Sequence, residues 1–207
     1  MDFSCHKELL IATQNKGKLR EISYSLSDLP LKLRTSAEYP NSPEVEETGK
    51  TFAENAVLKA RQLSQYTGLL TLADDSGLEV EALGGEPGIF SARYGGRNKS
   101  DHERDLLLLK NLARKHPGNR RARFVCAIAL AAPKSGAFKI FHGVCAGNIA
   151  IEPRGEHGFG YDPVFIPEGS ALTFGQLPES RKRQISHRSK AVAALRDFLS
   201  IYYPVSA

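Results

Sequence analysis

Cysteines, long hydrophobic runs and a strong net charge are all scarce in this chain, and each shortage narrows the possible classes of protein. The three cysteines, Cys5, Cys126 and Cys145, are widely spaced and form no metal-binding pair of the CxxC type, so we expect reduced, buried thiols in a cytoplasmic protein. No apolar run approaches the roughly 20 residues of a membrane-spanning helix, and the first residues lack the pattern of a signal peptide. The net charge of +5, from 28 Lys and Arg against 23 Asp and Glu, is too small to indicate nucleic-acid binding by itself, and it suits a small polyanionic ligand.

The rest of the composition is that of an ordinary globular protein. Of the 207 residues, 41% are hydrophobic and 25% are charged, a balance that supports a sizeable core. Repeats, linkers and low-complexity segments are absent from the sequence. We therefore predict a single domain that spans residues 1–207.

Two adjacent carboxylates, Asp74 and Asp75, stand out in the stretch ADDSGL at residues 73–78. The apolar run before them predicts a short buried strand, and the alternating residues 79–83 predict a half-buried one. We therefore expect a sharp, exposed turn between the two strands. A simple β-turn, in which Asp and Ser bind the backbone, would explain the stretch without any chemistry. Adjacent side chains on an extended backbone point to opposite faces, so only one of the two acids can easily face a given site.

Cations gather where two helices are predicted to begin. Lys16, Lys18 and Arg20 follow a short apolar strand and a polar loop, and residues 181–188 precede an amphipathic C-terminal helix with Ser186 as its expected N-cap. Cations are unfavourable at a helix N-terminus unless an anion is bound there by the outward-pointing N–H groups. Two such segments indicate a shared polyanion such as a triphosphate. The Walker pattern is absent from both.

An acidic loop and a further helix lie between these segments. The loop ends in EVEETG at residues 44–49, which is either a solvated surface or a source of carboxylates for Mg²⁺. Thr51 and Glu54 form a capping box that predicts a helix start. Lys59 lies off the apolar stripe of this helix, where it can reach a ligand or solvent.

The second half of the chain combines regular elements with one unusual loop. Ser100 and Glu103 form another capping box, and residues 123–132 and 138–151 read as a hairpin of long strands. The segment 154–163 has three glycines, two aromatic residues and several charges. Ordering such a segment is entropically unfavourable, which favours a functional loop over a structural turn.

Taken together, these stretches resemble the inosine triphosphate pyrophosphatases. The similarity covers roughly residues 8–200, and the motifs occur in the order of that family. The matching stretches are TQNKGK at 13–18, EETGKTFAENAVLKA at 46–60, ADDSGLEVEALGGEPGIFSARY at 73–94, FGYDPVF at 159–165 and SHR at 186–188.

The resemblance implies an α/β fold with a long twisted mixed sheet flanked by helices, and two lobes with the active-site cleft between them. It implies a homodimer that needs Mg²⁺ and acts on a purine nucleoside triphosphate, with no nucleic acid or membrane as partner. The implied reaction cleaves ITP, dITP or XTP between the α- and β-phosphates, which gives a nucleoside monophosphate and pyrophosphate. The implied role is removal of deaminated purine nucleotides from the cytoplasmic pool.

The resemblance also assigns roles to individual residues. Asp75 is expected to be the general base for water, and Glu46 and Asp75 are expected to hold Mg²⁺, with Glu47 and Asp74 the competing choices. The residues expected to bind substrate are Thr13, Gln14, Asn15, Lys16, Gly17 and Lys18 at the phosphates, with Ser76, Phe159, Gly160, Tyr161, Asp162, Lys182, His187 and Arg188 around the rest of the nucleotide.

Base selection is assigned to Arg188 as a hypothesis. Stacking on Phe159 cannot distinguish purines, because every purine offers the same flat face. An arginine has only donors, so it would donate a hydrogen bond to the O6 of hypoxanthine or xanthine and would disfavour the amino group of adenine. It would not reject guanine, which keeps O6.

Two other classes of protein compete with this interpretation. A Nudix-type pyrophosphohydrolase is suggested by Glu-Glu-Thr-Gly, but residues 43–45 are Pro-Glu-Val where that signature has an Arg-Glu pair. A nucleic-acid-binding module is suggested by the cationic segments, but the clustered acids would repel phosphates in the absence of a metal.

Overall fold

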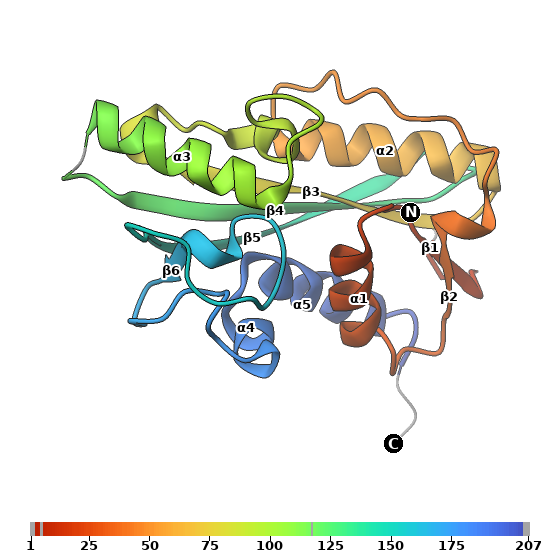
Figure 1. Cartoon of the computed structure of the whole chain (residues 1–207). Helices are drawn as coiled ribbons and strands as arrows, with labels where there is room; N and C mark the ends of the chain where they lie inside the picture. The colour runs from red at the N-terminus through yellow and green to blue at the C-terminus, as the bar shows by residue number, and fades with distance from the viewer. Residues whose placement is uncertain (1–2, 5, 117, 205–207) are drawn as a thin grey trace. The chain divides into compact units, whose positions relative to one another are not determined.

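The computed structural model describes residues 3–4, 6–116 and 118–204, which form an α/β fold around a mixed sheet (Figure 1). The described strands form a six-stranded sheet in the order β2-β1-β3-β4-β5-β6. Strand β1 is parallel to β2 and β3, whereas β5 is antiparallel to β6. The predicted mixed sheet is therefore confirmed. The strands are β1 (Glu8–Ile11), β2 (Lys32–Thr35), β3 (Leu70–Val80), β4 (Arg121–Ala131), β5 (Phe138–Ile149) and β6 (Phe165–Pro167).

Local signals explain where the longer helices begin. The Thr51 hydroxyl accepts a hydrogen bond from the Glu54 N–H, and Ser100 and Glu103 form a reciprocal capping box. Gly68, with φ of 70°, ends the helix that Thr51 begins. The α-helices are α1 (Lys16–Ser25), α2 (Phe52–Thr67), α3 (Asp101–Lys115), α4 (Glu179–Ile185) and α5 (His187–Ser200), and the 3₁₀ turns are η1 (Ser36–Glu38), η2 (Glu81–Leu83), η3 (Gly88–Arg93) and η4 (Asp162–Val164).

The chain divides into two compact units. Unit 1 comprises Met1–Asp75, Cys126–Gly143 and Arg188–Ala207, and unit 2 comprises Ser76–Val125 and Val144–His187. The predicted cleft between two lobes stays a prediction. Each unit has a hydrophobic core of its own.

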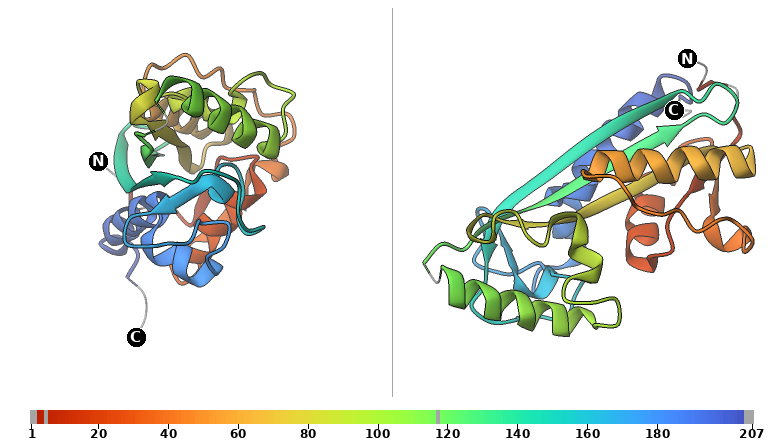
Figure 2. Two further views of the ribbon diagram at one scale, coloured as in Figure 1. Left: turned by 60° about the vertical axis from the view of Figure 1, so that its left-hand side comes forward. Right: turned by 90° about the horizontal axis from the view of Figure 1, so that it is seen from above.

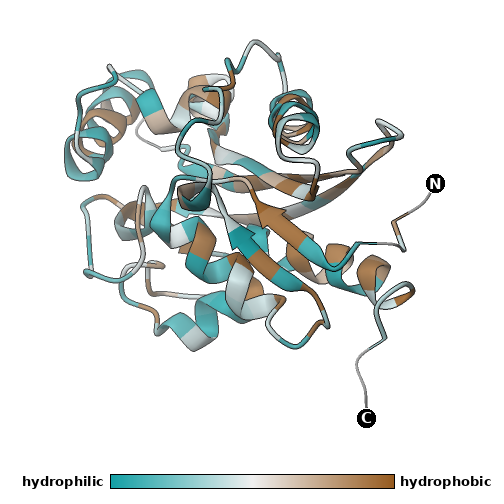
Figure 3. Cartoon of the chain, turned by 90° about the vertical axis from the view of Figure 1, so that its right-hand side faces the viewer, coloured by the Kyte–Doolittle hydropathy of each residue, from teal (hydrophilic) through white to brown (hydrophobic). Residues whose placement is uncertain are grey.

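In unit 1, helices cover both faces of the strands. Helices α1 and α5 bury Ile22 and Leu195 against Leu9 and Leu72 of the sheet, and Leu26, the C-cap of α1, joins the same core. Helix α2 lies along β3 on the other face (Figures 1 and 2). Figure 3 shows hydrophobic and hydrophilic residues on different sides of the helices, as amphipathic packing against a sheet requires.

In unit 2, helix α3 packs on the second half of β3. Its buried residues Leu108 and Leu112 belong to the same core as Leu78 and Val80. Aromatic side chains fill the remainder of this core, with the rings of Phe124 and Phe165 centred 4.6 Å apart.

The prediction of an exposed turn at residues 73–78 is wrong. Strand β3 runs without interruption from Leu70 to Val80, and Asp74 and Asp75 are buried within it. The Ser-Gly pair allows close packing instead of a turn. A Cβ at Gly77 would lie 2.4 Å from the Ser91 hydroxyl and 2.6 Å from the Gly88 carbonyl, so only glycine fits there.

The C-terminal segment also differs from the prediction. Lys182 and Arg183 lie in the last turn of α4, a separate short helix, and not at the N-terminus of the C-terminal helix. A helix C-terminus favours cations, so these two side chains need no bound anion. Ser186 ends α4, and α5 begins at the next residue.

Two other expectations concern the cysteines and membrane segments. Cys126 and Cys145 are free and buried, as predicted, whereas Cys5 lies outside the described residues. In the described part of the chain, no helix has the length and apolar character that crossing a bilayer demands.

Candidate active site

The loop between β1 and α1 presents an open helix N-terminus. Asn15 caps α1 by accepting a 3.0 Å hydrogen bond from the Lys18 N–H, and the Asn15 N–H donates to the Thr13 hydroxyl at 3.2 Å. The first turn of α1 contains no acidic residue, and Gln14, Asn15 and Lys16 are exposed. The positive end of the helix dipole is therefore available to an anion from outside the helix.

Asp74 is buried on the face of the sheet that α1 and α5 cover, and side chains from several elements bind it. Its carboxylate accepts hydrogen bonds from Lys18 Nζ, from Arg188 Nε at 2.9 Å and from Cys126 Sγ at 3.1 Å. Although burial opposes ionisation, the charges of Arg188 and Lys18 hold the pKa of Asp74 well below its usual range. Arg188 Nη1 also donates to Glu21 Oε2 at 2.5 Å. The cluster thus ties α1, β3, β4 and α5 together.

Asp75 points to the opposite face, toward α2. Its Oδ1 accepts from Lys59 Nζ at 2.9 Å, and its Oδ2 accepts from Asn55 Nδ2 at 3.3 Å. Lys59 Nζ also donates to Glu47 Oε1 at 2.9 Å and to the Asp74 carbonyl at 3.0 Å. Burial raises the pKa of Asp75 above its ordinary value, against the opposing effect of Lys59. Asp75 is suited to accept a proton because its pKa is raised and its Oδ2 accepts only the long hydrogen bond from Asn55.

The acidic loop contributes Glu47 to this cluster and leaves Glu46 outside it. The Glu47 side chain is half-buried against Lys59, whereas Glu46 is exposed. The expected choice of Glu46 over Glu47 therefore has no support from the geometry, which favours Glu47.

Glu47 and Asp75 together suit a hard divalent cation. Glu47 and Asp75 each place an oxygen 2.9 Å from one ammonium group, so their carboxylates already converge on a positive charge. Among the residues that the structure describes, no group of three or more His, Cys, Asp or Glu is arranged to hold a metal ion. Mg²⁺ needs only one or two protein carboxylates when substrate phosphates supply further ligands.

In unit 2, the glycine-rich loop is held by two carboxylates. Asp162 accepts hydrogen bonds from the Phe159 N–H at 2.8 Å and from Lys182 Nζ at 2.6 Å. Asp101, at the start of α3, accepts from the Gly160 N–H at 2.8 Å. Lys182 Nζ lies 4.7 Å from the centre of the Phe159 ring, within cation–π range. The loop is therefore anchored through its backbone, while the Phe159 ring stays half-buried.

Known proteins share this sequence over most of its length. A model of the Ham1 family matches residues 9–198. A dITP/XTP pyrophosphatase of Geobacter sulfurreducens is 48% identical over 191 residues, which cover 92% of this chain and 96% of that protein. The chain belongs to the Ham1 family. The solved structure of a HAM1 protein from Coxiella burnetii matches it with a TM-score of 0.87 at 44% identity, covering 94% of this chain and 98% of that one. The Ham1 protein of Staphylococcus aureus matches with a TM-score of 0.84 at 43% identity, with the same coverage.

The Ham1 fold brings the predicted site residues together in two groups. Unit 1 gathers Thr13, Asn15 and Lys18 near Asp74, and unit 2 gathers residues 159–162 around Lys182. Two predicted substrate ligands lie deeper than expected, which weakens the expectation that they touch substrate directly. Arg188 is 2% exposed and bound to Asp74 and Glu21, and His187 is stacked on Phe124 at 4.6 Å.

Asn55 and Asp101 were missed from the sequence, whereas Lys59 was noted as able to reach a ligand or solvent but was not assigned to the site. Asn55 and Lys59 lie four residues apart on α2, a spacing that places them on one face of the helix. That spacing, with Lys59 off the apolar stripe, was the available signal. Asp101 offered no such signal, because its residue type and position also suit an ordinary helix start.

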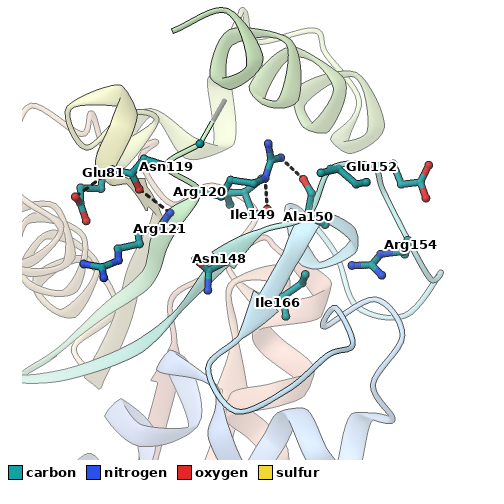
Figure 4. A pocket seen from close by; sticks show the side chains of 12 residues that line it. Glu81, Asn119, Arg120, Arg121, Asn148, Ile149, Ala150, Glu152, Arg154 and Ile166 are labelled. Atoms are coloured by element: carbon teal, nitrogen blue, oxygen red, sulfur yellow. Dashed lines mark hydrogen bonds between the residues drawn. The ribbon is translucent and has the colours of Figure 1, made fainter. Parts of the chain in front are cut away.

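A surface pocket in unit 2 is separate from both groups. It has a volume of about 760 Å³ and lies around Arg120, Asn148 and Arg154 (Figure 4). Arg120 donates to the carbonyls of Ile149 and Ala150, so its guanidinium braces the backbone. None of the predicted site residues is among its described lining residues. Pocket size alone does not identify the active site of this Ham1 protein.

Proposed function

We propose that this chain hydrolyses ITP, dITP and XTP to the nucleoside monophosphate and pyrophosphate. The observation that carries the proposal is the pair Asp74 and Asp75 with a lysine on each, Lys18 on one face of β3 and Lys59 on the other. Relatives named dITP/XTP pyrophosphatase support the choice of substrates. The charge of Lys18 acts on Asp75 as well as that of Lys59, so the proton acceptor has two cations near it that can bind a polyphosphate.

The loop at residues 13–18 is the proposed phosphate cradle. It offers backbone N–H groups at the start of α1, an exposed Lys16 and the Lys18 ammonium. Donors at a helix N-terminus bind phosphate without further adjustment. Lys18 is held in place by Asp74, so less side-chain freedom is lost when phosphate binds.

Asp75 is the proposed general base. It would take a proton from a water molecule whose oxygen attacks the α-phosphorus. The bond from the α-phosphorus to the bridging oxygen breaks, and pyrophosphate leaves with that oxygen. Lys59, fixed by Glu47 and Asp75, is placed to offset negative charge that builds up during this step.

Mg²⁺ is the proposed metal, with Asp75 and Glu47 as its protein ligands. When bound, it would supply Lewis-acid stabilisation of charge on the phosphate oxygens. The oxygens of Asp75 and Glu47 already meet at the Lys59 ammonium, which is the position where these two carboxylates would hold the ion.

The loop at residues 158–162 is the proposed nucleoside-binding element of unit 2. Phe159 offers a ring for stacking, and its backbone is pre-ordered by Asp162 and Asp101. Arg188 is better explained as the counter-ion of Asp74 than as a reader of the base, because its Nε and Nη1 already donate to carboxylates. We also propose that the protein is cytoplasmic and forms a homodimer. Light scattering of the purified protein tests the dimer.

Pyrophosphate release with Mg²⁺ tests the proposed reaction. We expect rapid release from dITP, XTP and ITP, slow release from ATP and GTP, and loss of activity with EDTA. The matched control is Asp75→Asn, which should be inactive with every substrate. Release of single phosphates instead of pyrophosphate, or equal rates for ATP and ITP, would contradict the proposal.

A further inference from the structure

Asp105 is a buried acid that the proposed reaction does not use. It lies in the second turn of α3, is 1% exposed, and its Oδ1 is buried without a hydrogen-bond partner among the described residues. Buried carboxylates normally have a cation or several N–H donors close by. A position of this kind needs an explanation beyond packing.

The charged groups around Asp105 are mostly acids. Asp101 lies one helical turn before it on α3, and Asp162 approaches from η4. Arg104 is near, but it donates to Asp101 and to the Lys99 carbonyl. Lys182, the cation on α4, pairs with Asp162. The nearby cations are thus bound to other acceptors.

Two tyrosines complete these surroundings. Tyr161 lies within the loop at residues 158–162 and donates its hydroxyl to the Ser91 carbonyl at 2.9 Å, and Tyr94 lies after η3 and accepts a hydrogen bond from Asn111. Both carry a phenol whose pKa is raised by burial, so neither adds a charge near neutral pH. An ionised Asp105 would therefore face two other carboxylates, while in the described part of the chain the nearby Arg104 and Lys182 are bound to other acceptors.

The acids beside Asp105 are the ones that anchor the loop at residues 158–162. Asp101 holds the Gly160 N–H, and Asp162 holds the Phe159 N–H. We propose that Asp105 is a positioning residue which, as a neutral carboxyl group, allows these two acids to hold the loop, and that loss of its proton releases the loop and weakens nucleotide binding. The inference rests on the proposed role of this loop in binding the nucleoside.

The ionisation of Asp105 falls in an accessible range of pH. Burial, together with the charges of Asp101 and Asp162, raises the pKa of Asp105 to about 8. At pH 9 roughly one molecule in ten keeps the proton, so binding that requires the neutral form is weakened about tenfold. Below pH 7 the neutral form dominates and no effect is expected.

The test compares the KM for dITP of the wild type and Asp105→Asn from pH 6.5 to 9. Asparagine has the shape of the neutral acid and no titration. We expect the ratio of wild-type to variant KM to rise about tenfold by pH 9, with little change in the ratio of kcat. Titration of the substrate is common to both proteins and cancels in the ratio. The exposed Asp197 gives the control, since Asp197→Asn should follow the wild type at every pH.

Hydrogen exchange gives a second readout that needs no activity. In the wild type, protection of the Phe159 and Gly160 amides should fall between pH 7 and 9 relative to amides of α2, and in Asp105→Asn it should not. If both proteins hydrolyse dITP and the KM ratio stays constant, the role of Asp105 is overturned while the proposed function stands. If neither the wild type nor Asp105→Asn hydrolyses dITP, the proposed function fails, and hydrogen exchange then tests the role of Asp105 by itself. Protection that stays unchanged with pH in the wild type overturns that role.

Discussion

Asp74 and Asp75 are adjacent, yet their substitution by asparagine should have different effects. Asp75→Asn should remove catalysis and leave the protein folded. Asp74→Asn should mainly lower stability. The reason is that β3 directs Asp75 toward Lys59 and Asn55, and Asp74 into the buried ion cluster with Lys18 and Arg188.

The expected magnitudes follow from these contacts. Loss of a general base lowers kcat by about 10²- to 10⁴-fold. Asp75→Asn removes one charge-assisted hydrogen bond, worth about 1.5–3 kcal/mol, but Lys59 keeps Glu47 as a partner, so the net loss should lie at or below that range. Asp74→Asn breaks the buried pairs of Asp74 with Lys18 and with Arg188, which is only 2% exposed and keeps Glu21 as its remaining carboxylate. Breaking a buried pair of this kind costs about 3–5 kcal/mol, or roughly 6–20 °C in Tm for a chain of this size.

Two measurements separate the variants. Pyrophosphate release from dITP gives kcat at a temperature where circular dichroism shows both proteins folded, and thermal melts give the change in Tm. A folded Asp75→Asn protein with kcat within about threefold of the wild type would refute the proposed base. A large fall in Tm for Asp75→Asn with none for Asp74→Asn would show that we have assigned the two carboxylates to the wrong faces.

Three further predictions concern the metal, the buried arginine and the buried acid of α3. Glu47→Gln should raise the Mg²⁺ concentration needed for half-maximal activity at least several-fold, and Glu46→Gln should not; a titration that gave the reverse order would return the metal to Glu46. Arg188→Met should lower Tm by several degrees and leave the ratio of kcat/KM for ITP and ATP unchanged, since its guanidinium binds Asp74; a fall in that ratio would restore a base-reading role. The pKa of Asp105 is about 3.9 in the unfolded chain and about 8 in the folded protein, so between these pH values the folded protein binds one proton more than the unfolded chain. The stability of the wild type relative to Asp105→Asn should therefore fall as pH rises from about 4 to 8, by at most about 1.4 kcal/mol per pH unit, and should stay constant above pH 8. Urea denaturation of both proteins at pH 5, 6, 7 and 9 checks this slope, and a constant difference would disprove the raised pKa.

Features that depend on neighbouring residues could be predicted from the sequence. The helix starts at Thr51 and Ser100 were correct because the capping residue and its partner lie within one turn. The opposite orientation of Asp74 and Asp75 was also correct, since it follows from strand geometry alone.

Features that depend on distant partners could not be predicted. Two adjacent acids normally indicate an exposed turn, and their burial in β3 is explained only by Lys18, Lys59 and Arg188, which are far apart in the sequence. The choice between Glu46 and Glu47 depends on the register of the acidic loop against α2, which no local pattern specifies. The resemblance to a known family supplied the residues around these positions, but not the contacts that decide their roles.

The contacts of Arg188 have a consequence for the order in which the chain folds. Its partners Asp74 and Glu21 precede it by 114 and 167 residues, so this charge is synthesised long after both of them. Contacts between such distant residues form late and slow the search for the native state. In a nascent chain without α5, Asp74 has Lys18 but not Arg188 as a counter-ion. The strands of unit 1 then also lack the helix that packs on one of their faces. Unit 1 therefore cannot complete its folding until α5 has been synthesised, and a protein that lacks α5 should depend on chaperones or be degraded.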